Sequence, residues 1–155
     1  MLTIDIANRQ TVLPVDPRRL RRAVRAVFRR ESIRDATVSV AVVDDATMRR
    51  LNREYLQHDV AADVLSFLLA SGPEGMEGEI LVSAETALAA AAAFGWEAEN
   101  ELLLYVIHGA LHLAGYRDDG TRRRAAMRQR EDRCLADLGL AAVPRSRRSR
   151  MSKSK

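Results

Sequence analysis

Apolar and polar residues alternate through much of the first half of the chain, and this spacing predicts β-strands. Residues 2-LTIDIA-7 alternate strictly, and 37-TVSVAVV-43 is rich in β-branched side chains. Two further apolar runs, 64-VLSFLL-69 and 79-EILVS-83, flank the segment 71-SGPEGMEG-78, whose three glycines and one proline indicate a turn. The last two strands are therefore predicted to form a hairpin, so at least part of the sheet is antiparallel.

Between these strands, apolar residues recur every three to four positions, which predicts helices. Residues 16–32 open with Asp16 as a natural N-cap and Pro17 at the first helical position. The apolar stripe expected on this helix is Leu20, Val24, Val27 and Phe28. A second helix is expected to begin at Asp44 or Asp45, with Met48, Leu51 and Tyr55 on one side.

The second half of the chain is predicted to be helical. Residues 84–94 have high helix propensity and precede Gly95, and a more apolar helix runs from about residue 97 to residue 114. The last helix begins near Thr121, and its expected buried stripe is Met127, Cys134, Leu135 and Leu138. Four strands and about five helices predict an α+β domain in which helices cover a small sheet.

Charge is unevenly distributed along the chain, which has a net charge of +4. The segment 145-RSRRSRMSKSK-155 holds six Lys/Arg and no acid, whereas the residues before it carry 19 basic and 21 acidic side chains. We therefore expect a single domain over residues 1–140 and a basic, disordered tail over residues 141–155. Such a tail is either merely solvated or a non-specific RNA tether. The arginines on the polar face of the helix at 16–32 allow the same two interpretations.

The N-terminal segment has no apolar region typical of a secretion signal, and no apolar run approaches the roughly 20 residues of a membrane span. Cys134 is the single cysteine, so no intrachain disulfide forms, which suits a reducing compartment. These features lead us to expect a cytoplasmic protein without a membrane partner.

The strongest chemical signal is the stretch 105-YVIHGALHLAGYRDDG-120. His108 and His112 are four residues apart, so a helix places both imidazoles on one face. Gly115 permits the left-handed backbone that ends a helix, after which Asp118 is in reach to supply a third ligand. Three protein ligands and one open position are typical of catalytic zinc. The alternative is a pair of core histidines bonded to backbone or carboxylate groups.

Several motifs of the chain, in order, resemble those of the YbeY-type metallo-endoribonucleases, which mature rRNA. The matching segments, with the family patterns beside them, are 51-LNREY-55 (L-N-x-x-Y/F), 63-DVLSF-67 (D-V-L-S-F), 78-GEILVS-83 (G-D-I-x-I-S), 108-HGALHLAGY-116 (H-G-x-L-H-L-x-G-Y), and Met127 with Glu131 (M-x-x-x-E). The resemblance covers nearly the whole chain up to about Leu138, and its motifs keep both order and spacing.

This resemblance implies a small α+β domain with a mixed four-stranded sheet and one zinc ion held by three histidines. It implies cleavage of single-stranded RNA in maturation of the small-subunit rRNA 3′ end and in ribosome quality control, in the cytoplasm. The implied partners are rRNA and ribosomal subunits, with ribosomal or assembly proteins; we expect neither DNA nor a membrane. By position, the first two ligands are His108 and His112, and the third falls on Asp118.

The third ligand is the first place where the chain departs from the family, which usually reads G-Y-D-H where this chain reads 115-GYRD-118. A carboxylate in place of the third imidazole lowers the charge of the zinc site from about +2 to about +1, so bound water becomes less acidic. Asp119 is the competing ligand. We prefer Asp118 because it keeps the family's register and because Asp119 is suited to cap the following helix together with Thr121.

A second departure lies in the loop 55-YLQHD-59, where Leu56 stands at the position of an arginine in the family. An arginine there is expected to bind the scissile phosphate or stabilise charge on it. His58 is a candidate for part of this contact, and the alternative is a solvent-exposed loop histidine. Gly109 occupies the position of the catalytic glutamate of H-E-x-x-H peptidases, which argues against a peptidase.

The leading hypothesis is therefore a zinc-dependent endoribonuclease specific for single-stranded RNA. The alternative is a ribosome-assembly factor that binds RNA and has weak or no nuclease activity, which the missing arginine motivates. Two histidines and a carboxylate also describe the iron site of non-haem oxygenases, although the strand barrel and ligand order of that class are missing.

Overall fold

The computed structural model describes residues 1–56 and 62–144, which form one four-stranded sheet and five helices. The strands are β1 (Leu2–Asn8), β2 (Ala36–Val43), β3 (Val64–Gly72) and β4 (Gly75–Ser83). Their order across the sheet is β1-β2-β4-β3. β1, β2 and β4 are parallel neighbours, and β3 pairs with β4 in antiparallel orientation. The predicted mixed sheet is confirmed.

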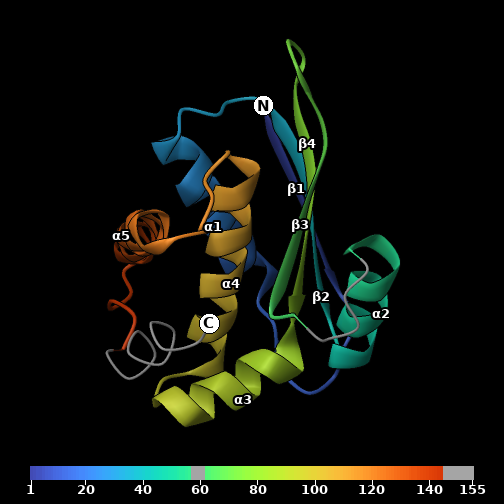
Figure 1. Cartoon of the computed structure of the whole chain (residues 1–155), viewed down its shortest axis with the longest axis vertical. Helices are drawn as coiled ribbons and strands as arrows, with labels where there is room; N and C mark the ends of the chain where they lie inside the picture. The colour runs from blue at the N-terminus through green and yellow to red at the C-terminus, as the bar shows by residue number, and fades with distance from the viewer. Residues whose placement is uncertain (57–61, 145–155) are drawn as a thin grey trace.

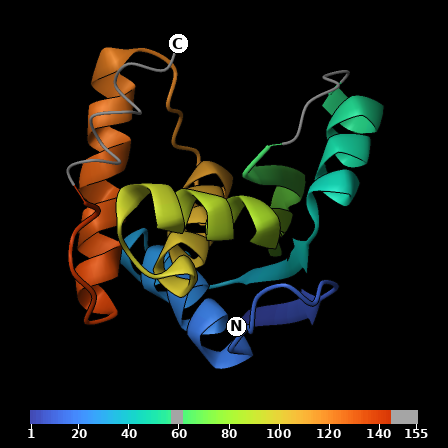
Figure 2. The ribbon, with the colours of Figure 1, turned by 90° about the horizontal axis from the view of Figure 1, so that it is seen from below.

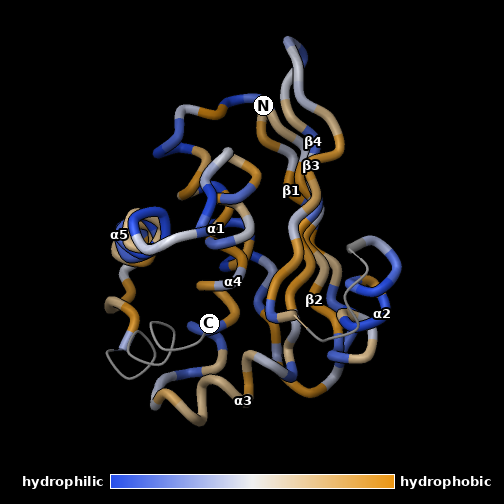
Figure 3. The backbone as a smooth tube through the Cα atoms, in the orientation of Figure 1, coloured by the Kyte–Doolittle hydropathy of each residue, from blue (hydrophilic) through white to orange (hydrophobic). Residues whose placement is uncertain are grey.

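Helices cover both faces of this sheet (Figure 1). They are α1 (Pro17–Arg30), α2 (Asp45–Leu56), α3 (Ala84–Phe94), α4 (Ala98–Leu113) and α5 (Thr121–Asp137). α1 and α4 lie on one face, α2 lies on the other, and α5 packs outside α1 and α4 (Figures 1 and 2). Apolar residues concentrate in the strands and in α4, which is the central helix (Figure 3). No helix in the described parts of the chain combines the length and apolarity that crossing a membrane requires.

The two faces of the sheet bury different side chains because neighbouring residues of a strand point in opposite directions. Ile80 and Val82 of β4 pack into the main core with α1 and α4, whereas Leu81 between them packs against Met48 of α2. The α1 stripe predicted from its spacing is buried, and the Asp16 side chain accepts a hydrogen bond from the Arg18 amide at 3.0 Å, as expected of an N-cap.

The β3–β4 hairpin differs from the prediction, which placed a turn over residues 71–78. The strands continue to Gly72 and Gly75, which pair with each other, so only two residues lie between the strands. Gly78 lies within β4, where it pairs with Val38 and Leu68. Its small size lets α4 pack closely, because a Cβ there would lie 2.8 Å from Cδ1 of Leu113. Glycine here marks close packing of a helix on a strand rather than a turn.

Gly109 allows a second close approach between α4 and the sheet. A Cβ at this position would lie 2.7 Å from Cγ2 of Ile80 and 3.0 Å from the Ser66 hydroxyl. The same hydroxyl donates a hydrogen bond to the Gly109 carbonyl at 3.1 Å. Helix α4 is therefore held directly against β3 and β4, next to His108. A peptidase glutamate has no room at this position, which agrees with the sequence argument against that class.

Candidate metal centre

His108 and His112 lie near the C-terminal end of α4 and direct their imidazoles to one point. Their Nε2 atoms are 3.0 Å apart, and the two rings stand at 75° to each other. The side chains are 18% and 31% exposed, so both are reachable from solvent and neither is an ordinary core residue. The helical spacing thus places the two imidazole nitrogens together, as predicted, and both are candidate metal ligands.

The chain reverses direction immediately after α4. Gly115 has a φ of +106°, and the amide of Tyr116 donates a hydrogen bond to the Leu111 carbonyl, which closes the end of the helix. This reversal brings Oδ2 of Asp118 to 3.2 Å from Nε2 of His108 and 3.6 Å from Nε2 of His112. A nitrogen or oxygen atom from each of the three residues lies within 4.8 Å of the others.

Asp119 takes a different direction from Asp118. Its carboxylate is exposed and accepts hydrogen bonds from Arg123 at 3.0 Å and from Arg117 at 3.2 Å. The prediction that Asp119 caps the last helix is wrong: the N-cap of α5 is Gly120, without a side-chain cap. The reason is electrostatic, because the guanidinium of Arg123, four residues later, binds the Asp119 carboxylate with a charge-assisted hydrogen bond.

Glu131 on α5 completes the arrangement around His108. Its side chain is 4% exposed, and Oε2 lies 2.6 Å from Nδ1 of His108. A carboxylate at Nδ1 holds the proton there and leaves the Nε2 lone pair free for a metal. The sequence carried one signal for this role: Glu131 shares the buried stripe of α5 with Met127, Cys134 and Leu135, where a charged residue needs a partner.

The charges of the cluster shift its pKa values in opposite directions. Burial favours the neutral imidazole of His108, but Asp118 and Glu131 outweigh burial and raise the pKa of His108 to about 10. The hydrogen bond with His108 holds the pKa of Asp118 at about 2. Burial and the neighbouring positive charge of His108 lower the pKa of His112. Without a metal, a proton on His108 is therefore the cation that neutralises the carboxylates.

The donor atoms fit a zinc ion. Zinc–ligand bonds of about 2.0–2.1 Å in a tetrahedron place neighbouring donors about 3.3 Å apart, and the three distances here are 3.0, 3.2 and 3.6 Å. Imidazole and carboxylate are both common zinc ligands, and a second carboxylate already orients His108. The three side chains thus have the chemistry and the spacing of a site with one open position.

Comparison with known proteins shows which family this chain belongs to. A family model described as endoribonuclease YbeY matches residues 5–139. The chain belongs to the YbeY family. Proteins named endoribonuclease YbeY from Chlorobium phaeobacteroides and Chlorobium phaeovibrioides are 40% and 35% identical to this chain; the matches cover 88% and 97% of it and 98% and 100% of those proteins. The resemblance found in the sequence motifs is thereby confirmed.

Two other matches differ in what they cover. The Rhodopirellula baltica protein of the same name is 42% identical over 106 residues, and the match spans 55% of that longer relative. A solution structure from Thermotoga maritima matches all of this chain and 97% of its own with a TM-score of 0.58. This structural similarity supports the α+β fold, and at 24% sequence identity it supports nothing beyond the fold.

In this YbeY family member, a groove of about 480 Å³ opens beside the histidines, between β3 and α4. Its walls include Ser66, Leu68 and Leu113. Among the described residues that line it, none is an arginine or lysine. The last residue of α2 is Leu56, which stands at the family's arginine position, and His58 lies outside the described residues.

Two arginines line an adjoining small hollow together with His108, Asp118 and Glu131. They are Arg124 and Arg128, which are four residues apart on α5 and therefore on one face of it. No sequence motif marks these two arginines, because only the packing of α5 against α4 brings them beside the candidate metal ligands.

Proposed function

We propose that this YbeY endoribonuclease depends on one zinc ion, held by Nε2 of His108, Nε2 of His112 and Oδ2 of Asp118, and that it cleaves single-stranded RNA. The observation that carries the proposal is the convergence of these three donor atoms at the edge of an open groove. The cellular role proposed from the family is maturation of the small-subunit rRNA 3′ end and ribosome quality control, in the cytoplasm with ribosomal subunits as partners.

The side chains of the site divide the chemical work. When bound, zinc polarises a phosphate oxygen or lowers the pKa of a water molecule. Glu131 keeps the proton of His108 on Nδ1 and fixes the orientation of that ring. The groove between β3 and α4 provides space for one RNA strand beside the open position.

Asp118 also sets the electrostatics of the site. Two neutral imidazoles and one carboxylate leave a zinc site with a charge of about +1, which attracts a phosphate less strongly than the about +2 of a three-histidine site. Arg124 and Arg128 on α5 are the nearby positive charges that compensate for this difference. We therefore propose that both arginines support phosphate binding in place of the missing family arginine.

The domain boundaries remain part of the proposal, with one refinement. Val143 is buried against the core, and its amide donates a hydrogen bond to Asp132 at 3.4 Å. We therefore place the end of the folded domain after Val143 instead of at residue 140. The basic segment 145–155 lies outside the described residues, and its role as an RNA tether stays a prediction.

The decisive experiment measures metal content and cleavage together. Protein purified with one zinc ion should cleave a single-stranded RNA oligonucleotide, and His112→Ala should lose both zinc and cleavage. Asp119→Ala is the matched control, because its carboxylate faces Arg123 instead of the histidines. Cleavage that continues after complete metal removal would contradict the proposal. Finding iron instead of zinc in freshly purified protein would favour the alternative of an iron site like that of non-haem oxygenases.

A second candidate function is a ribosome-assembly factor that binds RNA and cleaves it weakly or not at all. The absence of arginine and lysine from the described lining of the groove favours it. Full rescue of a deletion strain by His112→Ala would support this candidate over the enzyme. His58→Ala tests the remaining hypothesis for the loop: unchanged RNA cleavage rates would remove His58 from the mechanism.

A further inference from the structure

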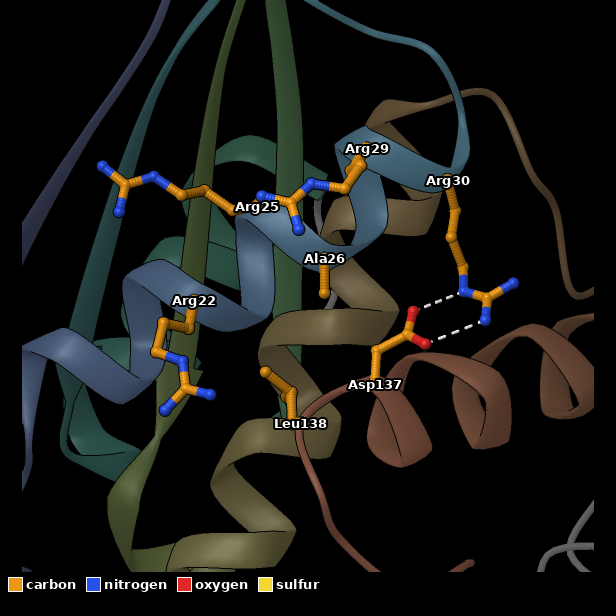
Figure 4. A pocket seen from close by; sticks show the side chains of 7 residues that line it. All are labelled: Arg22, Arg25, Ala26, Arg29, Arg30, Asp137 and Leu138. Atoms are coloured by element: carbon orange, nitrogen blue, oxygen red, sulfur yellow. Dashed lines mark hydrogen bonds and ion pairs between the residues drawn. The ribbon is translucent and has the colours of Figure 1, made fainter.

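A row of arginines on α1 lines a second hollow, of about 630 Å³, between this helix and the C-terminal end of α5. Arg22, Arg25 and Arg29 follow each other at intervals of three and four residues, so they lie on one face of the helix. All three are exposed and line the hollow from the α1 side, and Figure 4 shows them opposite Asp137 and Leu138, which belong to the α5 side. We call this hollow the arginine groove.

The positive charge of the arginine groove is only partly neutralised. Arg30 forms an ion pair with Asp137 through two bonds, one of them 2.9 Å long (Figure 4). Asp137 is the one carboxylate among the described residues that line the groove. Three residues before Arg22, Arg19 pairs with Glu99 at 2.6 Å, so the charge of this arginine is neutralised within the fold. The guanidinium groups of Arg22, Arg25 and Arg29 therefore provide an excess of positive charge.

This arrangement suits a chain of phosphates better than a single anion. With a rise of 1.5 Å per residue, Arg22 and Arg29 are separated by about 10 Å along the helix axis. Guanidinium groups bind phosphate oxygens through two parallel hydrogen bonds, and a row of them can contact successive phosphates. Like charges on one helix face repel each other, so a polyanion in the groove relieves this repulsion.

The lining also distinguishes RNA from a protein partner. Ala26 and Leu138 are the apolar residues of the groove, and its described lining has no aromatic side chain. Protein interfaces depend on a buried apolar or aromatic centre, which such a lining does not provide. Contacts to the sugar–phosphate backbone need only positive charge. The segment 145–155 is itself basic in sequence, so its charge does not suit it as a ligand of the groove.

We infer that the arginine groove binds the phosphate backbone of an RNA segment other than the one that enters the metal groove. The inference rests on the proposed function, since it takes RNA as the substrate. The two grooves share no lining residue, and α4 packs against both α1 and β3, so it lies between them. A long RNA can thus contact both grooves, whereas a short oligonucleotide at the metal site leaves the arginine groove empty.

The test compares two triple variants of equal charge change. Arg22→Glu, Arg25→Glu and Arg29→Glu together alter the groove, and Arg9→Glu, Arg34→Glu and Arg50→Glu alter exposed arginines outside it. Fluorescence anisotropy gives the Kd for a long rRNA fragment and for a short single-stranded oligonucleotide at several salt concentrations. Zinc content and cleavage of the short oligonucleotide are measured in parallel.

We expect the groove variant to bind the long fragment at least about tenfold more weakly than the control variant. Loss of three phosphate contacts should lower the slope of log Kd against log salt by about 2. Zinc content and cleavage of the short oligonucleotide should stay at wild-type levels. If the wild-type protein does not cleave the short oligonucleotide, the proposed function is wrong. If the two variants have equal Kd values for the long fragment, the inference that RNA binds the arginine groove is wrong.

Two further measurements keep the outcome clear. If the glutamate variant unfolds, the corresponding glutamine variant replaces it, because glutamine removes the charge without adding repulsion against Asp137. A poly-glutamate peptide serves as the protein-like competitor. If the groove variant binds long RNA like the control but loses binding to poly-glutamate, the groove is a protein site and the inference is wrong.

Discussion

The carboxylate of Glu131 lies 2.6 Å from Nδ1 of His108, although 23 positions separate the two residues in the sequence. The contact joins α5 to α4 and fixes which nitrogen of His108 is available as a ligand. Burial of Glu131 strengthens this interaction, because little water competes for either partner. Under the proposed zinc site, zinc affinity should therefore depend on Glu131, a residue that is not among the proposed ligands.

Glu131→Gln should weaken zinc binding by about 10- to 100-fold, the range typical for loss of a carboxylate behind a histidine ligand. The amide keeps the size of the side chain, so the fold should persist. Competition titration with a chromophoric chelator measures the affinity. Asp137→Asn on the same helix is the control and should leave zinc affinity unchanged, because Asp137 pairs with Arg30. Equal affinities of the two variants would argue against the positioning role.

Asp118 and Asp119 should respond differently to substitution. Asp118→Ala removes a donor atom 3.2 Å from Nε2 of His108 and should abolish zinc binding at micromolar concentrations. Asp119→Ala should retain it, since that carboxylate contacts Arg123 and Arg117. Metal analysis after dialysis distinguishes the two. A reversed result would make Asp119 the ligand.

Asp118→His provides a complementary test of the charge of the site. A third neutral imidazole raises the charge of the zinc site from about +1 to about +2, which makes bound water more acidic. We therefore expect the Asp118→His variant to retain zinc. The midpoint of the rise in its cleavage rate with pH should move to lower pH. Cleavage rates of a short RNA between pH 5 and pH 9 show the shift. An unchanged midpoint would mean that the charge of the third ligand does not control this step.

Gly109→Ala should destabilise the protein by about 1–3 kcal/mol, the usual cost of overpacking. The new Cβ would lie 2.7 Å from Cγ2 of Ile80, so α4 must move away from β4. Because His108 is the neighbouring residue, zinc affinity should fall as well. Gly72→Ala is the matched control, since no heavy atom lies within 4 Å of a Cβ there and its φ is not positive. Urea unfolding measures both variants, and equal midpoints would contradict the close packing.

Zinc uptake should release protons at neutral pH. In the metal-free protein, burial lowers the pKa of His108, but Asp118 and Glu131 outweigh burial and raise this pKa to about 10. The ring is therefore protonated at neutral pH, and zinc must displace a proton from it. Apparent zinc affinity should rise by about tenfold per pH unit between pH 7 and pH 9 for this one proton. Calorimetry in two buffers of different ionisation heat counts the protons released. A release near zero would contradict the ion pair.

The same shift affects the stability of the metal-free protein. Since the folded pKa of His108 is raised above the ordinary value of about 6.5, its contribution to stability is fully present below that pH. It is lost as the pH rises through about 10. Thermal unfolding of the zinc-depleted protein should therefore show a falling Tm over this range. Glu131→Gln should flatten the dependence, because one of the two carboxylates that raise the pKa is removed.

The sequence by itself determined the local structure of this protein. Alternation predicted the strands, a period of 3.6 predicted the helices, and the spacing of His108 and His112 placed their rings together, because each of these depends only on neighbours along the chain. Gly115 was predicted to end α4 with a left-handed backbone, and its φ of +106° confirms this. The family motifs could be recognised for the same reason, because each of them is a short run of neighbouring residues.

Only the tertiary structure decided which groups meet across elements. The choice between Asp118 and Asp119 depends on how the turn after α4 directs two adjacent side chains. The role of Gly78 depends on α4, because Leu113 of that helix fills the space beside the strand that a side chain would occupy. The contact of Glu131 with His108 depends on helices packing together. Such contacts are set by the shape and charge of distant surfaces, which periodicity along one segment does not encode.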